Sequence, residues 1–221
     1  MLKPFLFLVC LLPLALLAWQ GFTGHLSANP ISDITNETGI WTLRFIVITL
    51  AITPLRQITK LHALIKFRRM IGLFAFFYGS LHFTTYLWLD QFFDWQSILR
   101  DIPKRPFILV GFTSFILMIP LAVTSTKKMI RRLGGKKWNV LHRLVYATAI
   151  GGVIHYYWLV KADTGRPITY GIILVVLFAF RVWKLVPSRL ARRQFELSTR
   201  TSLANRTIET IPTRNDATSA E

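Results

Sequence analysis

The sequence is poor in cysteine and in acidic residues. Cys10 is the single cysteine in 221 residues, which excludes a disulfide scaffold, a four-cysteine iron–sulfur cluster and a cysteine-based zinc site. Asp and Glu number only 10 against 27 Lys and Arg, and charged residues make up 17% of the chain. With 52% hydrophobic residues, the chain is too apolar for a disordered protein, and its long apolar runs disfavour a nucleic-acid-binding protein. The composition therefore indicates an integral membrane protein.

Six apolar stretches predict an all-α, polytopic bundle of six transmembrane helices. They are Phe5–Gln20, Ile40–Thr53, Met70–Leu89, Phe107–Thr124, Val140–Val160 and Thr169–Val186. A span needs about 20 residues, so we expect the short second stretch to extend at one end or to tilt little. The first stretch also resembles a signal peptide, because Lys3 precedes its apolar core. We expect it to be retained as a helix.

The basic residues predict the orientation of these helices. The segments Pro54–Arg69, Ser125–Asn139 and the tail after Val186 together hold 17 Lys and Arg, whereas the three intervening loops hold 5. Because basic loops stay in the cytoplasm, both termini are predicted to be cytoplasmic. We interpret residues 1–190 as the membrane domain and residues 191–221, which are polar and rich in Ser, Thr, Asn and Arg, as a disordered cytoplasmic tail.

Histidines are the candidate functional side chains, because ionisable groups inside a bilayer are costly and default to functional hypotheses. His82 lies 12 residues after Met70 and His155 lies 15 residues after Val140, on two predicted helices that run in the same direction. At 1.5 Å per residue, their depths differ by only about 5 Å. Two neutral imidazoles at matched depth are suited to bind one haem iron from opposite sides.

Small residues accompany both histidines. Gly79 precedes His82 by three residues on the stripe that begins at Arg68, and Gly151 precedes His155 by four residues. Small residues beneath a histidine leave room for a flat macrocycle between helices. Close helix packing without any cofactor gives the same pattern, and an interhelical hydrogen bond is the structural alternative for each histidine.

His142 is harder to place. It lies 13 residues before His155, a rise of about 20 Å, which is long enough for two stacked cofactor sites. On an ideal helix the two side chains would point about 140° apart, so a shared face does not follow. A second haem would need a partner for His142, and Arg68 lies at similar depth on the third span while His62 is nearby in sequence. Contact with lipid headgroups or with a haem propionate are the alternatives for Arg68.

Several motifs resemble the ferric-reductase-like transmembrane family. They are Arg68–Leu73, Tyr78–His82 and Lys104–Phe107. Three further segments narrow the resemblance to the MsrQ (YedZ) family, the haem-binding membrane subunits of bacterial periplasmic methionine sulfoxide reductase systems. These segments are Arg131–Trp138, Leu141–Tyr146 and His155–Trp158. The likeness runs from the first span to about Lys184.

The resemblance implies haem b, one or two per chain, with His82, His142 and His155 as iron ligands and Gly79 and Gly151 beside the cofactor. It also implies FMN, a bacterial inner-membrane location, electrons from the quinol pool or a cytosolic flavin reductase, and delivery to a periplasmic molybdenum-containing reductase, MsrP. One departure concerns the third span, where the wider family commonly has two histidines and this chain has Arg68 fourteen residues before His82.

The chain is thus predicted to be an electron-transfer subunit and not the catalytic subunit. The predicted spans contain no Asp or Glu, and no sequence constellation indicates hydrolysis or group transfer. No glycine-rich nucleotide-binding motif follows a strand, so we expect a separate electron donor. Two other classes stay open, namely a proton channel or small-solute transporter with a histidine relay, and a membrane anchor without cofactor.

Overall fold

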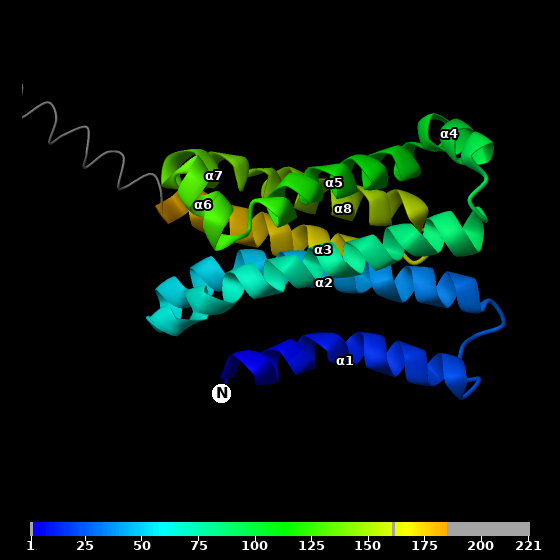
Figure 1. Ribbon diagram of the computed structural model, residues 1–221, viewed down its shortest axis with the longest axis horizontal. Helices are drawn as coiled ribbons and strands as arrows, with labels where there is room; N and C mark the ends of the chain where they lie inside the picture. The colour runs from blue at the N-terminus through cyan, green and yellow to red at the C-terminus, as the bar shows by residue number, and fades with distance from the viewer. Residues whose placement is uncertain (1, 161, 185–221) are drawn as a thin grey trace, which may run out of the picture. The chain divides into compact units, whose positions relative to one another are not determined.

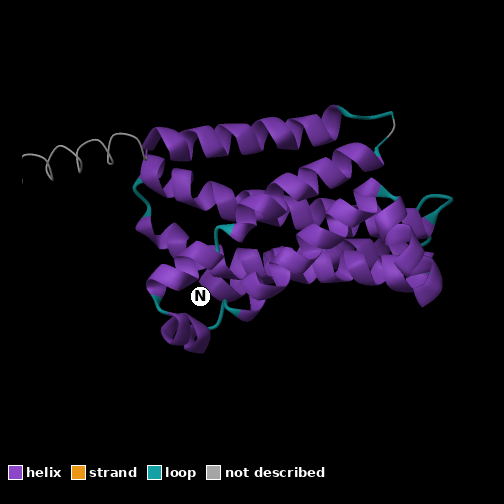
Figure 2. Cartoon of the chain, turned by 90° about the horizontal axis from the view of Figure 1, so that it is seen from above, coloured by secondary structure: helices purple, strands orange, loops and turns teal. Residues whose placement is uncertain are grey.

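The apolar stretches form helices, because a helix satisfies every backbone N–H and C=O within its own segment in a bilayer. The computed structural model describes residues 2–160 and 162–184, and regular structure within these two ranges is helical (Figures 1 and 2). Its elements are α1 (Leu2–Phe22), α2 (Pro30–Thr59), the 3₁₀ turn η1 (His62–Leu64), α3 (Ile65–Thr85), the π-helical turn η2 (Tyr86–Asp90), α4 (Trp95–Lys104), α5 (Pro106–Val123), α6 (Lys127–Leu133), α7 (Gly135–Leu141), α8 (Leu144–Leu159) and a last helix, Gly165–Lys184.

Five helical segments of the described chain are long and apolar enough to cross a membrane. They are Leu2–Phe22, Pro30–Thr59, His62–Asp90, Pro106–Val123 and Gly165–Lys184. The predicted all-α polytopic fold is therefore confirmed. The remaining predicted span corresponds to α8, whose 16 residues make a helix about 24 Å long, shorter than the roughly 30 Å hydrocarbon layer.

The second span is much longer than its apolar stretch. Helix α2 has 30 residues and extends past the predicted Ile40–Thr53 at both ends, so the expectation of extension at one end was too small. It continues through Pro54, although an interior proline removes one hydrogen bond and usually ends a helix. Transmembrane helices tolerate proline because neighbouring groups satisfy the freed carbonyl.

The predicted basic loops are largely helical. Arg68 lies on the first turn of α3, and the segment Ser125–Asn139 forms α6 and most of α7. The predicted fifth span does not begin as one continuous helix, because α7 ends at Leu141 and α8 begins at Leu144. The last residues of the sixth span and the predicted tail, residues 191–221, lie outside the described residues.

Residues Met1–Leu177 form one compact unit. Within it α2 packs along α3 and α5 packs along α8, and the two pairs meet chiefly where α3 contacts α5 (Figure 1). The second unit begins at Phe178, and its described part, up to Lys184, is the end of the last helix, in which the Phe180 and Trp183 rings are 6.1 Å apart. All sites below belong to the first unit.

Aromatic side chains fill the interface between α2 and α3. The Phe45 ring centre lies 5.2 Å from that of Tyr78 and 5.8 Å from that of Phe74, and all three side chains are buried. Gly72 on α3 faces Thr49 on α2 at ordinary van der Waals distance, which allows the two backbones to approach closely. This packing holds α3 against α2 and so fixes the rotation of α3 about its axis.

Candidate functional site: two facing histidines

His82 and His155 face each other near one end of the bundle. His82 lies three residues before the end of α3, and His155 lies four residues before the end of α8. Their ring centres are 6.0 Å apart, with the ring planes at 77°. A metal–imidazole nitrogen bond is about 2 Å long and the ring centre lies roughly 1 Å further, so two imidazoles on opposite sides of one metal have centres about 6 Å apart. The observed separation fits that arrangement.

Backbone carbonyl groups fix the tautomer of both histidines. The Nδ1 atom of His82 lies 2.9 Å from the carbonyl oxygen of Thr35, and that of His155 lies 2.6 Å from the carbonyl oxygen of Phe107. A carbonyl oxygen only accepts hydrogen bonds, so each Nδ1 carries the proton and donates it. Each Nε2 therefore keeps its lone pair, which is the state that a metal-binding imidazole needs.

Two glycines that the sequence motifs did not reveal make room for these rings. A Cβ atom on Gly39 of α2 would lie 3.0 Å from Cε1 of His82, and one on Gly111 of α5 would lie 2.6 Å from Nδ1 of His155. Real Cβ atoms essentially never approach other atoms as closely as the second distance. Each histidine ring thus lies against the backbone of a glycine on a neighbouring helix.

Both rings line a cavity of about 690 Å³, a volume within the 300–1,000 Å³ typical of cofactor sites. It is lined by residues of α2, α3, η2, α4, α5 and α8, and Gly79 is among them. Two polar atoms on the lining residues, Oγ1 of Thr35 and the hydroxyl of Tyr86, are buried without a hydrogen-bond partner in the described residues. Buried polar groups are normally paired, so these two hydroxyls are available to a polar group inside the cavity.

The two histidine nitrogens suit a metal ion that a macrocycle already coordinates. Among the described residues, no group of three or more His, Cys, Asp or Glu side chains is placed to hold a bare metal ion. The facing pair supplies two nitrogens, and haem needs only two axial ligands because its porphyrin supplies the other four. The two histidine nitrogens and the volume of the cavity are therefore compatible with haem.

His142 lies outside this cavity. It is the C-cap residue that follows α7, so the 140° offset expected from an uninterrupted helix does not apply. Its ring stacks on Trp138 with centres 3.8 Å apart, and its Nδ1 lies 3.1 Å from the Trp138 carbonyl oxygen. The two residues paired by predicted depth, Arg68 and His142, lie within electrostatic range of each other.

The two small-residue stripes differ in role. Gly79 faces Thr42, Phe115 and Met118, and it borders the cavity. Gly151 lies against the Ser114 hydroxyl, which leaves no space for a Cβ, and it thereby allows α8 to pack directly on α5. Gly79 on α3 therefore borders the cavity, whereas Gly151 lies at the contact between α8 and α5 and is not among the lining residues.

The chain matches known proteins over most of its length. Residues 38–153 match the family described as "Ferric reductase like transmembrane component". Proteins named "Protein-methionine-sulfoxide reductase heme-binding subunit MsrQ" are 54% identical in Herminiimonas arsenicoxydans, covering 83% of this chain and 85% of that protein, and 51% identical in Caulobacter vibrioides, covering 80% and 84%. The chain belongs to the MsrQ family of ferric-reductase-like transmembrane proteins. The relative in Azospira oryzae, also named MsrQ, is 54% identical and covers 81% of this chain and 78% of its own length.

MsrQ membership agrees with the motifs that carried the resemblance. The family match begins at Thr38, next to Gly39, and includes His82, Gly111 and His142, while His155 lies two residues beyond its end. No solved structure matches this chain.

Proposed function

We propose that the chain is a haem b electron-transfer subunit of a bacterial inner membrane. The observation that carries the proposal is the facing pair His82 and His155, whose Nε2 atoms are both left free to bind by hydrogen bonds at Nδ1. The chain's relatives are named as heme-binding subunits of a protein-methionine-sulfoxide reductase, which supports the same cofactor for this chain. His82 and His155 would hold the haem iron, and the haem would supply one-electron redox chemistry there.

The position of the pair supports transfer towards the outer side of the membrane. His82 and His155 lie near the ends of α3 and α8 that lead to α4 and to the last helix, whereas the strongly basic segments lie at the opposite ends of these helices. With the basic side in the cytoplasm, both termini are cytoplasmic and the pair lies near the periplasmic surface. Electrons that reach this pair are then close to a periplasmic acceptor.

The proposed acceptor is a periplasmic, MsrP-type molybdenum-containing reductase that reduces oxidised methionine in proteins. The relatives' name, a heme-binding subunit of a reductase, supports a separate catalytic subunit. The proposed donors are the quinol pool or a cytosolic flavin reductase, and FMN is the proposed second cofactor from the family resemblance. The protein's own residues bind and orient the haem, and catalysis on the methionine takes place in the partner.

His142 is the proposed ligand of a second haem on the cytoplasmic side. Its neighbour Arg68 supports a site there, because a guanidinium can pair with a haem propionate or complete the surroundings of the iron. To bind iron through Nε2, His142 would give up the 3.5 Å contact of that atom with the Ser125 hydroxyl and could keep the contact of Nδ1 with the Trp138 carbonyl.

Optical spectroscopy of the purified full chain tests the proposal. We expect a haem absorption band that shifts on reduction by dithionite, and a loss of one haem per chain in His82→Ala and in His155→Ala. His142→Ala should leave that haem in place. His25→Ala, which changes an exposed histidine outside the cavity, is the matched control and should keep the wild-type spectrum. A colourless wild-type protein after expression with ample haem would contradict the proposal and favour the proton-channel or anchor alternatives.

A further inference from the structure

The outer end of the cavity is polar, in contrast to its apolar depth. Tyr86 begins the π-helical turn η2, and its hydroxyl is buried without a hydrogen-bond partner among the described residues. Single π-helical turns occur often at functional sites, because the extra residue redirects a side chain. An unpaired buried hydroxyl is costly unless a ligand supplies its partner. Tyr86 therefore marks where a polar part of the ligand lies.

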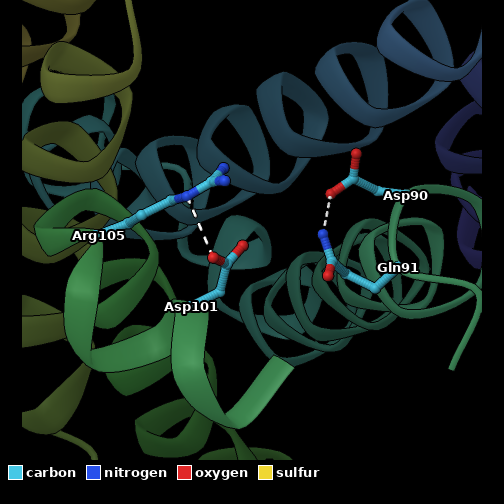
Figure 3. A network of polar contacts seen from close by, with 4 residues as sticks. All are labelled: Asp90, Gln91, Asp101 and Arg105. Atoms are coloured by element: carbon cyan, nitrogen blue, oxygen red, sulfur yellow. Dashed lines mark hydrogen bonds and ion pairs between the residues drawn. The ribbon is translucent and has the colours of Figure 1, made fainter. Parts of the chain in front are cut away.

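Arg105 borders the same end of the cavity. It links α4 to α5, with Pro106 at the first position of α5. Its Nε lies 3.3 Å from a carboxylate oxygen of Asp101, and Figure 3 shows the two terminal nitrogens directed away from that carboxylate. No ion pair or hydrogen bond of these terminal nitrogens is found within the part of the chain that the structure describes. Tyr86, Asp90 and Arg105 all line the cavity, and Tyr86 lies within electrostatic range of Asp101, Asp90 and Arg105.

We propose that Tyr86 and Arg105 form a carboxylate subsite that binds a propionate of the haem held by His82 and His155. This inference rests on the proposed function, since it presupposes haem in the cavity. Haem has an apolar ring and two carboxylates on one edge, which matches a cavity with an apolar depth and a polar outer end. A guanidinium has five N–H donors, so Arg105 can keep Asp101 on Nε and bind a carboxylate through its terminal nitrogens.

The neighbouring acidic residues do not occupy this subsite. Asp101 takes the Nε side of Arg105, and its pairing offsets its own negative charge. Asp90 also lines the cavity, and one of its carboxylate oxygens accepts a hydrogen bond from Nε2 of Gln91 at 2.8 Å (Figure 3). Both carboxylates thus have partners, while the Tyr86 hydroxyl and the terminal nitrogens of Arg105 remain to bind an anionic group.

Binding of haem and of haem dimethyl ester to the full chain, prepared without haem in detergent, tests the subsite. The ester has the same ring and iron but no carboxylate charge. We expect wild type to bind haem at least about ten-fold more tightly than the ester, because charge-assisted hydrogen bonds are lost with the ester. Arg105→Gln should reduce this preference to near unity by weakening the binding of haem alone, and Tyr86→Phe should reduce it partly.

Arg100→Gln is the matched control, because Arg100 is an exposed arginine on α4 that does not line the cavity. It should keep the wild-type preference. Equal binding of haem and ester by wild type, or equal weakening of both by Arg105→Gln, would overturn the subsite while leaving the haem proposal intact. A wild-type chain that binds neither would overturn the proposed function and the subsite with it.

Discussion

Gly111 lies directly against the imidazole of His155, since a Cβ on this glycine would come within 2.6 Å of Nδ1. The contact joins α5 to α8 and stands beside the hydrogen bond from that Nδ1 to the Phe107 carbonyl oxygen. On the other side of the cavity, Gly39 of α2 has a similar but looser relationship with His82. The absence of a side chain on the two glycines therefore leaves the space that the two histidine rings occupy.

Substitution of these glycines should impair haem binding in proportion to the overlap. Gly111→Ala must displace the His155 ring, so we expect loss of most of the bound haem. Gly39→Ala, with its nearest His82 atom at 3.0 Å, should cause a smaller loss. Gly72→Ala on α3 meets Thr49 at an ordinary 3.6 Å and should keep full haem content. Haem per chain, measured by the pyridine haemochrome spectrum, ranks the three variants.

A Gly111→Ala protein with a full haem content would contradict this ranking and exclude a role for the His155 orientation. A variant that fails to fold is recognised by comparing helix content with that of Gly72→Ala by circular dichroism.

The pairing of His82 with His155 was accessible from the sequence, because both lie on predicted helices of the same direction and at nearly equal rise. The glycines opposite them were not accessible. Which residue of a neighbouring helix faces a ring depends on the rotation of that helix about its axis, and packing of many side chains sets this rotation. Gly39 also lies just before the predicted second span, so its depth could not be compared with that of His82.

Three other features of the structure differ from the sequence-based predictions. The predicted second span stops at Thr53, yet α2 continues through Pro54 to Thr59, since neighbouring groups can satisfy the carbonyl that a proline frees in a transmembrane helix. The interruption after Leu141 has no proline or glycine signal in its two linking residues, His142 and Arg143. Intramembrane Arg44 was missed among the ionisable groups, and only the structure shows its partners, Trp41 and Tyr170.

Arg44 should contribute to packing between α2 and the last helix. Its Nε donates to the Tyr170 hydroxyl at 3.2 Å, and its guanidinium carbon lies 4.5 Å above the centre of the Trp41 ring. Arg44→Met removes both interactions and should lower the free energy of unfolding by about 1–2 kcal/mol. Tyr170→Phe should cost less, and the double variant should cost less than the sum, because both changes remove the same hydrogen bond. Denaturation in mixed detergent measures all three, and strict additivity would contradict the hydrogen bond.

Asp94 should make the order of α4 depend on pH. Its carboxylate caps the helix and accepts hydrogen bonds from the Ser97 hydroxyl at 2.7 Å and from two backbone N–H groups, of Ser97 and Gln96. The hydrogen bonds from Ser97 hold the pKa of Asp94 below its ordinary value. Because the pKa is depressed in the folded state, the stabilisation is complete above the ordinary pKa of about 3.9 and is lost as the pH falls through the depressed value.

Amide hydrogen exchange of α4, corrected for the intrinsic rate, measures this effect between pH 6 and pH 2. Wild type should lose protection at the acidic end. Asp94→Asn retains a capping side chain without a titrating group, so its protection should change much less with pH. The same loss of protection in Asp94→Asn would show that another group causes it.

Tyr78 should hold α1 against α3. Its hydroxyl accepts a hydrogen bond from the backbone N–H of Leu14 at 3.1 Å and donates one to the carbonyl oxygen of Cys10 at 3.0 Å. In a regular helix these two backbone groups would bond to each other, so the hydroxyl is inserted into the backbone ladder of α1 next to Pro13. Tyr78→Phe should therefore weaken the docking of α1 by about 1 kcal/mol.

Cys10 is the single cysteine and is buried, so its rate of labelling by a thiol reagent reports this docking without any added probe. We expect labelling to become several-fold faster in Tyr78→Phe and to stay unchanged in Tyr157→Phe, which alters a tyrosine whose side chain is exposed on α8. An unchanged rate in Tyr78→Phe would mean that apolar packing alone holds α1 in place.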